Sequence, residues 1–288
     1  MFIAPMLAAP LKGWTLQPGE WHAEEKFDGI RLIVEVLHDV PEDLLSTFTV
    51  RTWSRDGIAH AVPRHVREAL GKLPTGIYDA ELYVPGKRSY GATRLDQQER
   101  LCVVVFDILQ LNGTNTMDVP LRYRRNLLLE IFERPFIRTL APLVHLAEAR
   151  ILHSMADMET FRDEVWARDG EGLILKALAS LYAPGKRNRK LWVKVKDLKS
   201  DVLTVVGFQP SRGEIVNRGP YAMAVLQNEK GIVTTVKTRN DAEIARLERA
   251  AVAGTKHPWI GRKLRIEFQE HTPDGNYRHP RWDRWEDE

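Results

Sequence analysis

The stretch "EEKFDGIRLIVEVL", residues 24–37, joins a charged segment to an apolar run. Asp28 and Gly29 are a turn signal, and the β-branched run after them predicts a strand. If the start of the stretch is extended, Glu24, Lys26 and Asp28 share one face. Lys26 is then held at a defined point at the lip of a sheet. An ordinary surface lysine is the alternative, but a fixed position is what a nucleophile needs.

A lysine nucleophile must first lose its proton. The free side chain has a pKa of about 10.4, so attack near neutral pH needs help of roughly 3 units, or about 4 kcal/mol. Nearby carboxylates favour the charged form, so positive charge has to outweigh them. The sequence offers Arg31, the lysines of "WVKVK" (192–196), or a bound metal that neutralises the acids. We therefore expect segments that are far apart in the chain to converge on Lys26.

The first two thirds of the chain predict a mixed fold with many strands. The 288 residues are enough for two domains or one large one. Helical patterns interrupt the strand-like runs, but few strict βαβ alternations occur, so we expect an α+β fold of antiparallel sheets with helices outside. The predicted strands are 31–37, 46–54, 76–84, 100–109, 172–178 and 191–196, and the predicted helices are 62–73, 122–133 and 158–168.

The last third has a different pattern. Short strand candidates at 202–209, 221–227, 232–238 and 263–271 surround one helix candidate at 241–253. This pattern suits a small β-barrel of the OB type. A polar, lysine-rich segment near 197–201 marks the boundary, so we predict a first domain over 1–198 and an OB-type domain over 199–288.

Composition limits the cellular location and the partners that the protein can have. Lys and Arg total 42 against 39 Asp and Glu, a formal net charge of +3, which does not exclude a basic face. Cys102 is the only cysteine, so no internal disulfide can form, and we expect it in the core. The sequence shows no secretion signal and no apolar run of membrane-spanning length. We expect a cytoplasmic monomer with no membrane partner.

Two carboxylates and a basic run are further site candidates. We expect Glu81 in "DAELYV" and Glu171 in "DGEGLILK" at strand edges, next to a glycine or a turn. Each alone could be an ordinary surface acid, but paired carboxylates on neighbouring strands would hold Mg²⁺, which prefers oxygen ligands. The Walker sequence is absent, so phosphates would need other cations. Lys194 and Lys196 alternate on a predicted strand and share one face, although a solvated charge run is the usual meaning of such a segment.

Taken together, these segments resemble the ATP-dependent DNA ligases of the covalent nucleotidyltransferase superfamily. The resemblance runs nearly end to end, and the motifs keep the family's order. It implies that the domain over 1–198 is a nucleotidyltransferase (adenylation) domain. The matching segments are "PMLA" (5–8), "EKFDGIR" (25–31), "WSRDG" (53–57), "DAELYV" (79–84), "VVVFDILQLNG" (103–113), "EGLILK" (171–176) and "WVKVK" (192–196).

The resemblance implies a role for each matching residue. Lys26 would attack the α-phosphate of ATP and hold AMP through a phosphoramidate. The other implied roles are reading of the adenine amino group by Glu24, stacking on the adenine by Phe106 (otherwise a core phenylalanine), ribose or 5′-phosphate contacts by Arg31 and Arg55, ribose or metal contact by Glu81, metal contact by Glu171, α-phosphate contacts by Lys194 and Lys196 with Lys176 nearby, and phosphate or DNA contact by Arg187.

The C-terminal motif departs from the family pattern. "RHPRWDRWEDE" (278–288) resembles the last motif, in which an arginine and an Asp-Lys pair lie over the departing pyrophosphate. Arg281 and Arg284 are present, but Asp287-Glu288 replaces the Asp-Lys. A separate loop, 210–220, carries Arg212 and Arg218, which we expect to contact DNA unless the loop is a plain solvated hairpin.

The implied function is sealing of nicks in duplex DNA with ATP as co-substrate and Mg²⁺, or Mn²⁺, as metal. An RNA ligase or an mRNA-capping guanylyltransferase would share the lysine and the fold. Glu171-Gly172 and the "PMLA" lead favour a DNA ligase, because the capping pattern usually has Asp-Gly at that point. A catalytically inactive nucleic-acid clamp built on an OB barrel is an alternative from another class, and the intact set of lysines and carboxylates argues against it.

Overall fold

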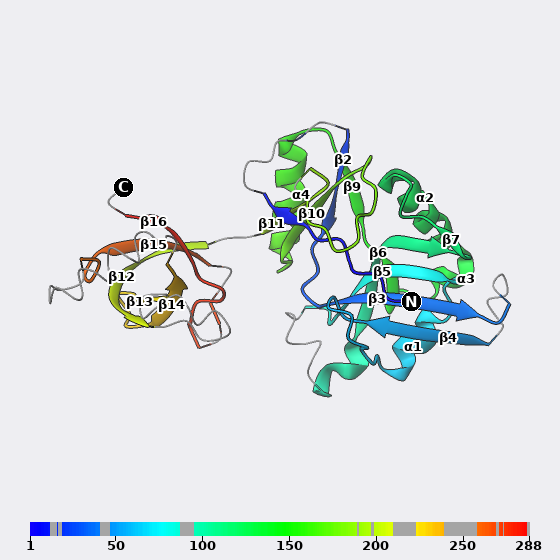
Figure 1. Cartoon of the computed structure of the whole chain (residues 1–288), viewed down its shortest axis with the longest axis horizontal. Helices are drawn as coiled ribbons and strands as arrows, with labels where there is room; N and C mark the ends of the chain where they lie inside the picture. The colour runs from blue at the N-terminus through cyan, green and yellow to red at the C-terminus, as the bar shows by residue number, and fades with distance from the viewer. Residues whose placement is uncertain are drawn as a thin grey trace. The chain divides into compact units, whose positions relative to one another are not determined.

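The computed structural model divides the chain into two compact units, Met1–Lys196 and Asp197–Glu288. Figure 1 shows their strands and helices. The residues described are 1–11, 16, 19–40, 47–86, 95–188, 190–196, 199–209, 223–238, 258–268, 271–272 and 274–286.

The first unit contains two sheets. One has the strand order β4-β3-β5-β6-β7 with β8 paired to β6, and the other has the order β1-β11-β10-β2-β9. All pairs are antiparallel except β1 with β11 and β6 with β8. The strands are β1 (Ala9–Pro10), β2 (Trp21–Glu25), β3 (Ile30–His38), β4 (Phe48–Trp53), β5 (Gly76–Tyr83), β6 (Cys102–Leu111), β7 (Thr114–Asn115), β8 (Val144–Leu146), β9 (Ala149–Leu152), β10 (Gly172–Ala177) and β11 (Trp192–Lys196).

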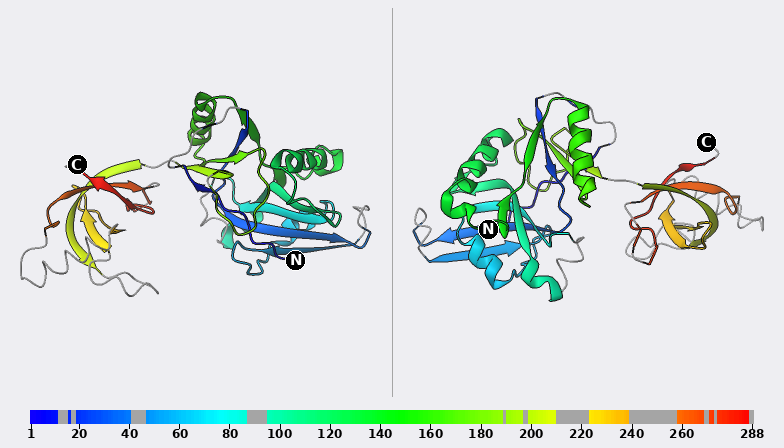
Figure 2. Two further views of the ribbon diagram at one scale, coloured as in Figure 1. Left: turned by 45° about the horizontal axis from the view of Figure 1, so that its top comes forward. Right: turned by 180° about the vertical axis from the view of Figure 1, so that it is seen from behind.

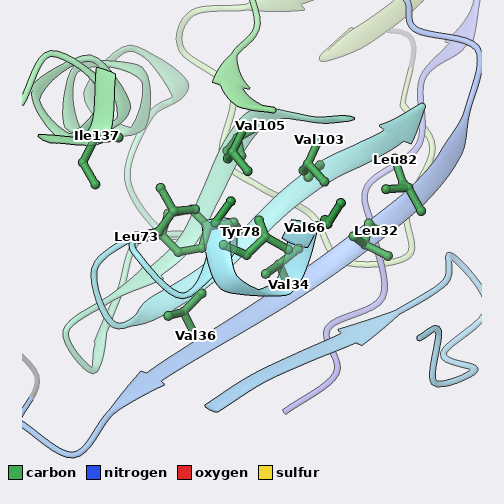
Figure 3. Close-up of a cluster of buried hydrophobic side chains, with 14 of the residues drawn as sticks. Leu32, Val34, Val36, Val66, Leu73, Tyr78, Leu82, Val103, Val105 and Ile137 are labelled. Atoms are coloured by element: carbon green, nitrogen blue, oxygen red, sulfur yellow. The ribbon is translucent and has the colours of Figure 1, made fainter. Parts of the chain in front are cut away.

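Helices cover these sheets. They are α1 (Arg64–Leu70), α2 (Leu121–Phe132), α3 (Pro135–Arg138) and α4 (Met155–Ala167), with one 3₁₀ turn at Leu95–Arg100. Apolar side chains of β3, β5 and β6 gather on one face of their sheet together with Val66 of α1 (Figure 3). Met158, Phe161 and Val165 of α4 pack on the other sheet. A further cluster joins the two sheets, because Ile33 of β3 and Ile77 of β5 pack with Trp192 of β11.

Most of the predicted strands are confirmed, but β2 was missed. Strand β2 pairs with β10 on one side and β9 on the other, and its side chains from Trp21 to Glu24 are all buried. Two of these buried side chains, His22 and Glu24, are polar. Trp21 and Ala23 do alternate with the polar residues, but the strand is only five residues long and has no β-branched residue, so it lacks the composition on which sequence-based strand prediction depends.

The connection from β2 to β3 carries the chain from one sheet to the other. Strand β2 ends at Glu25, and the backbone N–H of Lys26 still donates to the Gly172 carbonyl at 2.8 Å. Gly29 then passes so close to β5 that an added Cβ would lie 2.2 Å from the Leu82 carbonyl oxygen. Only glycine permits that approach. Lys26 consequently lies at the junction of the two sheets.

The second unit is built on one antiparallel sheet with the order β14-β13-β12-β15-β16. Trp259, Trp282 and Trp285 lie in its core. Figure 2 shows β12 curved along its length, and its register with β13 shifts between Val205 and Gly207. The strands are β12 (Lys199–Gln209), β13 (Met223–Gln227), β14 (Val233–Lys237), β15 (Lys263–Phe268) and β16 (Arg281–Trp285).

Two elements of the second unit either differ from the sequence predictions or lie outside the described residues. β16 was not predicted as a strand, and the helix predicted at 241–253 lies outside the described residues. Cys102 is buried in β6, as predicted. Within the part of the chain that the structure describes, no helix has the length and apolarity needed to span a membrane.

Candidate active site

A pocket beside Lys26 is lined by both sheets of the first unit. Strands β2, β10 and β11 contribute from one sheet, and β3, β5 and β6 contribute from the other. Six residues that the sequence singled out line it together. The lining residues are Ala8, Glu24, Glu25, Lys26, Phe27, Arg31, Glu81, Phe106, Ile174, Lys176 and Trp192.

Lys26 and Lys196 share one carboxylate. The Lys26 Nζ pairs with Oε2 of Glu171, and the Lys196 Nζ pairs with Oε1 of the same side chain. Glu171 directly precedes β10, and Gly172 is paired with Lys196 in the sheet. The structure therefore brings the end of β11 to Lys26, as the sequence argument required. The Lys26 side chain is 22% exposed, so its amine is accessible while its position is fixed.

Glu81 lies on the opposite side of the junction. The expectation that Glu81 sits at a strand edge is wrong, because it lies inside β5, paired with both β3 and β6. It is also not on a strand neighbouring Glu171, since β5 and β10 belong to different sheets. Its Oε1 accepts from the Gly29 N–H at 3.2 Å. The two carboxylates are therefore contributed by different sheets and not by neighbouring strands of one sheet.

Burial raises the pKa of the Glu81 carboxyl to about 7, although the Lys26 ammonium and the Arg31 guanidinium act in the opposite direction. The Glu171 carboxylate adds to the increase. Folding thus raises this pKa above its ordinary value of 4.5. The stability that the protonated group contributes is full below pH 4.5 and is lost as the pH rises through about 7.

We expect Glu81→Gln to flatten this pH dependence. The wild-type free energy of unfolding falls between pH 5 and pH 8 by more than that of Glu81→Gln, because the glutamine has no proton to lose. Urea denaturation of both proteins across this range measures the difference. The exposed α4 residue Glu159, changed to Gln, is the control and leaves the wild-type slope in place. Equal slopes for wild type and Glu81→Gln would contradict the buried-carboxyl account.

Glu24 and Lys176 form a buried ion pair in the pocket wall. The Lys176 Nζ lies 2.6 Å from Glu24 Oε2 and donates to the Phe106 carbonyl at 3.1 Å. It also lies 4.7 Å from the Phe106 ring centroid and 4.4 Å from that of Trp192. Burial would raise the pKa of Glu24, but the Lys176 ammonium and His22 outweigh it and hold the pKa at about 2.

Arg31 is held by residues that the sequence reasoning did not name. Its Nε and Nη2 donate to the two oxygens of the fully buried Asp79 at 2.5 and 2.6 Å. The Tyr182 hydroxyl donates to the same carboxylate at 2.6 Å and accepts from the Met6 N–H at 2.9 Å. The Arg31 Cζ lies 4.6 Å from the Phe106 ring centroid. Burial would lower the pKa of Arg31, but the Asp79 carboxylate outweighs it and leaves the pKa raised.

One of these missed residues did have a signal in the sequence. Asp79 precedes Glu81 by two positions in a predicted strand, so both side chains are expected on the same face of the sheet. Tyr182 had none, because it lies in the loop between β10 and β11 and reaches Asp79 only through the tertiary fold.

Other predicted site residues lie away from the pocket lining. Arg55 is 60% exposed on the turn after β4, with Asp56 as its ion-pair partner at 3.3 Å. Arg187 is exposed and forms a bridge with Leu7. Lys194 faces Ile174 in the β10–β11 register. The remaining predicted residues are Arg281 and Arg284, on β16 of the second unit, and Arg212 and Arg218, which lie outside the described residues.

The residues at the junction fit a magnesium ion that is shared with phosphates. Across the described ranges no group of three or more His, Cys, Asp or Glu side chains could hold a metal alone. Mg²⁺ is commonly bound through one or two carboxylates together with waters and substrate phosphates. Glu81 and Glu171 supply two carboxylates. The Glu171 charge raises the pKa of Glu81, so the two groups lie within electrostatic reach of each other.

Comparison with known proteins decides the family. The family model described as "ATP dependent DNA ligase domain" matches residues 5–196. The chain belongs to the ATP-dependent DNA ligase family. The match covers the first unit, with both sheets and the pocket beside Lys26.

Curated sequence relatives are named as DNA ligases or probable DNA ligases. A DNA ligase of Methanothrix thermoacetophila is 27% identical over 238 residues, which are 75% of this chain and 40% of that protein. A probable DNA ligase of Nocardia farcinica is 27% identical over 300 residues, 89% of this chain and 55% of that protein. The chain therefore spans about half or less of the length of these curated relatives.

Solved structures of the family share the fold. A structure from work on Lig E DNA ligases, described as binding DNA with a minimal scaffold, has a TM-score of 0.73 at 19% identity and covers 99% of this chain and 100% of that one. The ligase domain of Mycobacterium tuberculosis LigD has a TM-score of 0.55 at 22% identity and covers 99% and 95%. At these identities the similarity supports the DNA ligase fold and carries no residue roles.

Proposed function

We propose that this chain is an ATP-dependent DNA ligase that seals nicks between a 5′-phosphate and a 3′-hydroxyl in duplex DNA. The observation that carries the proposal is the position of Lys26. Its amine lies at the sheet junction, in a pocket lined by an aromatic ring, an arginine and carboxylates, and beside a second lysine across Glu171. Family membership favours this chemistry over capping or RNA joining.

The first reaction forms a bond between the Lys26 nitrogen and the α-phosphorus of ATP and breaks the bond to pyrophosphate. Phe106 stacks on the adenine, and Arg31 contacts the ribose from the position that Asp79 fixes. Lys196, and Lys194 from the same strand, bind the α-phosphate. Positive charge beside the developing phosphoryl oxygens accounts for most of the acceleration in such transfers. The nick 5′-phosphate then takes the AMP from Lys26, and the 3′-hydroxyl displaces it.

Magnesium would be held by Glu81 and Glu171 together with the phosphates. When bound, the metal neutralises phosphate charge and orients the leaving pyrophosphate. Glu171 pairs with the Lys26 ammonium, and the same ammonium acts to lower the pKa of Glu81, so a carboxylate from each sheet acts on this amine. Mn²⁺ would bind the same oxygen ligands.

The second unit completes the proposal. Its five-stranded antiparallel sheet, with a curved first strand, supports an OB-type barrel. Arg281 and Arg284 would lie over the pyrophosphate during the first reaction, without the lysine that the family motif has. Arg187, Arg212, Arg218 and Arg55 would contact the phosphates of nicked DNA, so binding weakens as salt rises. We propose that the enzyme acts as a monomer.

A two-part experiment tests this function. The intact mass after incubation with ATP gains one AMP, GTP gives no adduct, and chelation by EDTA prevents the gain. A nicked duplex with a 5′-phosphate is then sealed, whereas a nicked RNA is not. An adduct with GTP would support a capping enzyme, and sealing of RNA alone would support an RNA ligase. If no adduct forms and no substrate is sealed, the result supports a nucleic-acid clamp.

A further inference from the structure

A cluster of buried polar groups lies behind the pocket wall. It consists of His22 and Glu24 on β2, Lys176 on β10 and Arg125 on α2, and each is less than 10% exposed. Only Glu24 and Lys176 line the pocket. His22 and Arg125 contact Glu24 from behind, and neither is part of any sequence motif discussed above.

The contacts converge on one carboxylate. Oε2 of Glu24 pairs with Lys176, and Oε1 lies 3.1 Å from His22 Nε2 and 3.9 Å from Arg125 Nη1. The other Arg125 nitrogen, Nη2, donates to the Ala147 carbonyl and so fixes the guanidinium. In its Nε2–H tautomer, His22 places an N–H against Oε1. Each oxygen of Glu24 therefore has a nitrogen of a basic side chain within 4 Å.

The charges explain why this arrangement matters. Burial lowers the pKa of His22, so the neutral ring can face Glu24 with an N–H group without adding charge. Lys176 is 1% exposed, and an ammonium at that depth requires a carboxylate partner. A displaced Glu24 would move Lys176, whose Nζ lies over Phe106 and Trp192. His22 is thus one contact from the pocket-lining Glu24 and two contacts from Lys176.

We propose that His22 and Arg125 are positioning residues that fix Glu24 and, through it, the Lys176 ammonium against which the purine base of the nucleotide is bound. This inference rests on the proposed function and deepens it. The two residues act on binding of the base and not on the Lys26 amine, because Lys26 pairs with Glu171 and Lys196 lies on the other oxygen of that carboxylate.

The test measures KM and kcat for ATP in self-adenylation. His22→Phe and Arg125→Met raise KM about tenfold, the effect of losing one hydrogen bond to a charged group, while kcat at saturating ATP stays within about twofold. His22→Gln restores most of the affinity, because its amide can donate to Oε1. His38→Phe is the matched control: His38 is also a buried strand histidine, bonded to the Leu73 carbonyl at 3.0 Å and outside the pocket lining.

A second measurement separates the two proposals. Equilibrium dialysis with labelled ATP, on the Lys26→Ala background, reports binding without adduct formation. If wild type binds ATP but forms no adduct, the proposed function is wrong and the dialysis still decides the role of His22. If His22→Phe weakens binding no more than His38→Phe, or if His22→Gln is as weak as His22→Phe, the positioning role is wrong. If no variant binds ATP, both proposals are wrong.

Discussion

We expect Lys26→Ala to form no covalent AMP adduct under conditions in which the wild-type chain is fully adenylated. Neither of the neighbouring amines that the structure describes can replace it at the same place. Lys196 is held on the far oxygen of Glu171, and the Lys176 ammonium is buried against Glu24. A displacement at phosphorus depends on the approach and distance of the nucleophile, so a neighbouring amine does not substitute.

Intact mass after incubation with ATP measures this result, and nick sealing is lost with it. Lys72→Ala is the control, since Lys72 follows α1 at the far side of its sheet, beside the Phe48 and Phe136 rings. It keeps the wild-type mass gain. Lys26→Ala should also unfold at the same urea concentration as wild type within error, because the side chain is partly exposed. An adduct of unchanged yield in Lys26→Ala would remove the basis of the proposed mechanism.

The second large effect concerns stability. We expect Asp107→Asn to lower the free energy of unfolding by about 3–5 kcal/mol, the usual cost of leaving a buried charge without its partner. Asp107 and Arg124 are both fully buried. The guanidinium donates to the two carboxylate oxygens at 2.7 and 3.0 Å and to the Val119 and Ser180 carbonyls.

Urea denaturation at neutral pH measures the loss. The matched comparison is the double variant Asp107→Leu with Arg124→Met, which removes both charges and keeps apolar volume. Replacement of a whole buried pair is often neutral or stabilising, so the double variant should be more stable than Asp107→Asn. If Asp107→Asn lowers the free energy of unfolding by less than the double variant does, the pair does not contribute as a unit.

The position of Asp107 also connects the core with the site. It follows Phe106 on β6, so its ion pair with α2 anchors the strand that presents the aromatic ring to the pocket. Loss of the pair is expected to weaken ATP binding as well as stability.

Local patterns in the sequence were enough to locate much of the first unit. The run after Gly29 predicted β3, and the apolar run through Cys102 predicted β6. They also located Lys26, Glu171 and Lys196, because each lies where a strand begins or ends. Such features depend on neighbours within a few positions, so the chain carries them before it folds.

The same patterns failed where burial was polar. Glu24 was expected on one face of a charged segment with Lys26, yet it is buried inside β2, and Lys176 neutralises it from β10. Glu81 looked like a strand-end ligand, yet it lies inside β5, where burial raises its pKa. Alternation of apolar residues cannot report a buried carboxylate whose partner is more than a hundred positions away.

The sequence by itself determined most of the longer strands, the position of Lys26 before a turn and the order of the family motifs, because periodicity, turn residues and motif spacing are short-range properties. Only the tertiary structure decided that β2 and β3 belong to different sheets and that Lys26 lies between them. It also decided which acid neutralises which cation around the pocket. These pairings depend on distances between strands and on burial, and neither is a property of any single stretch of chain.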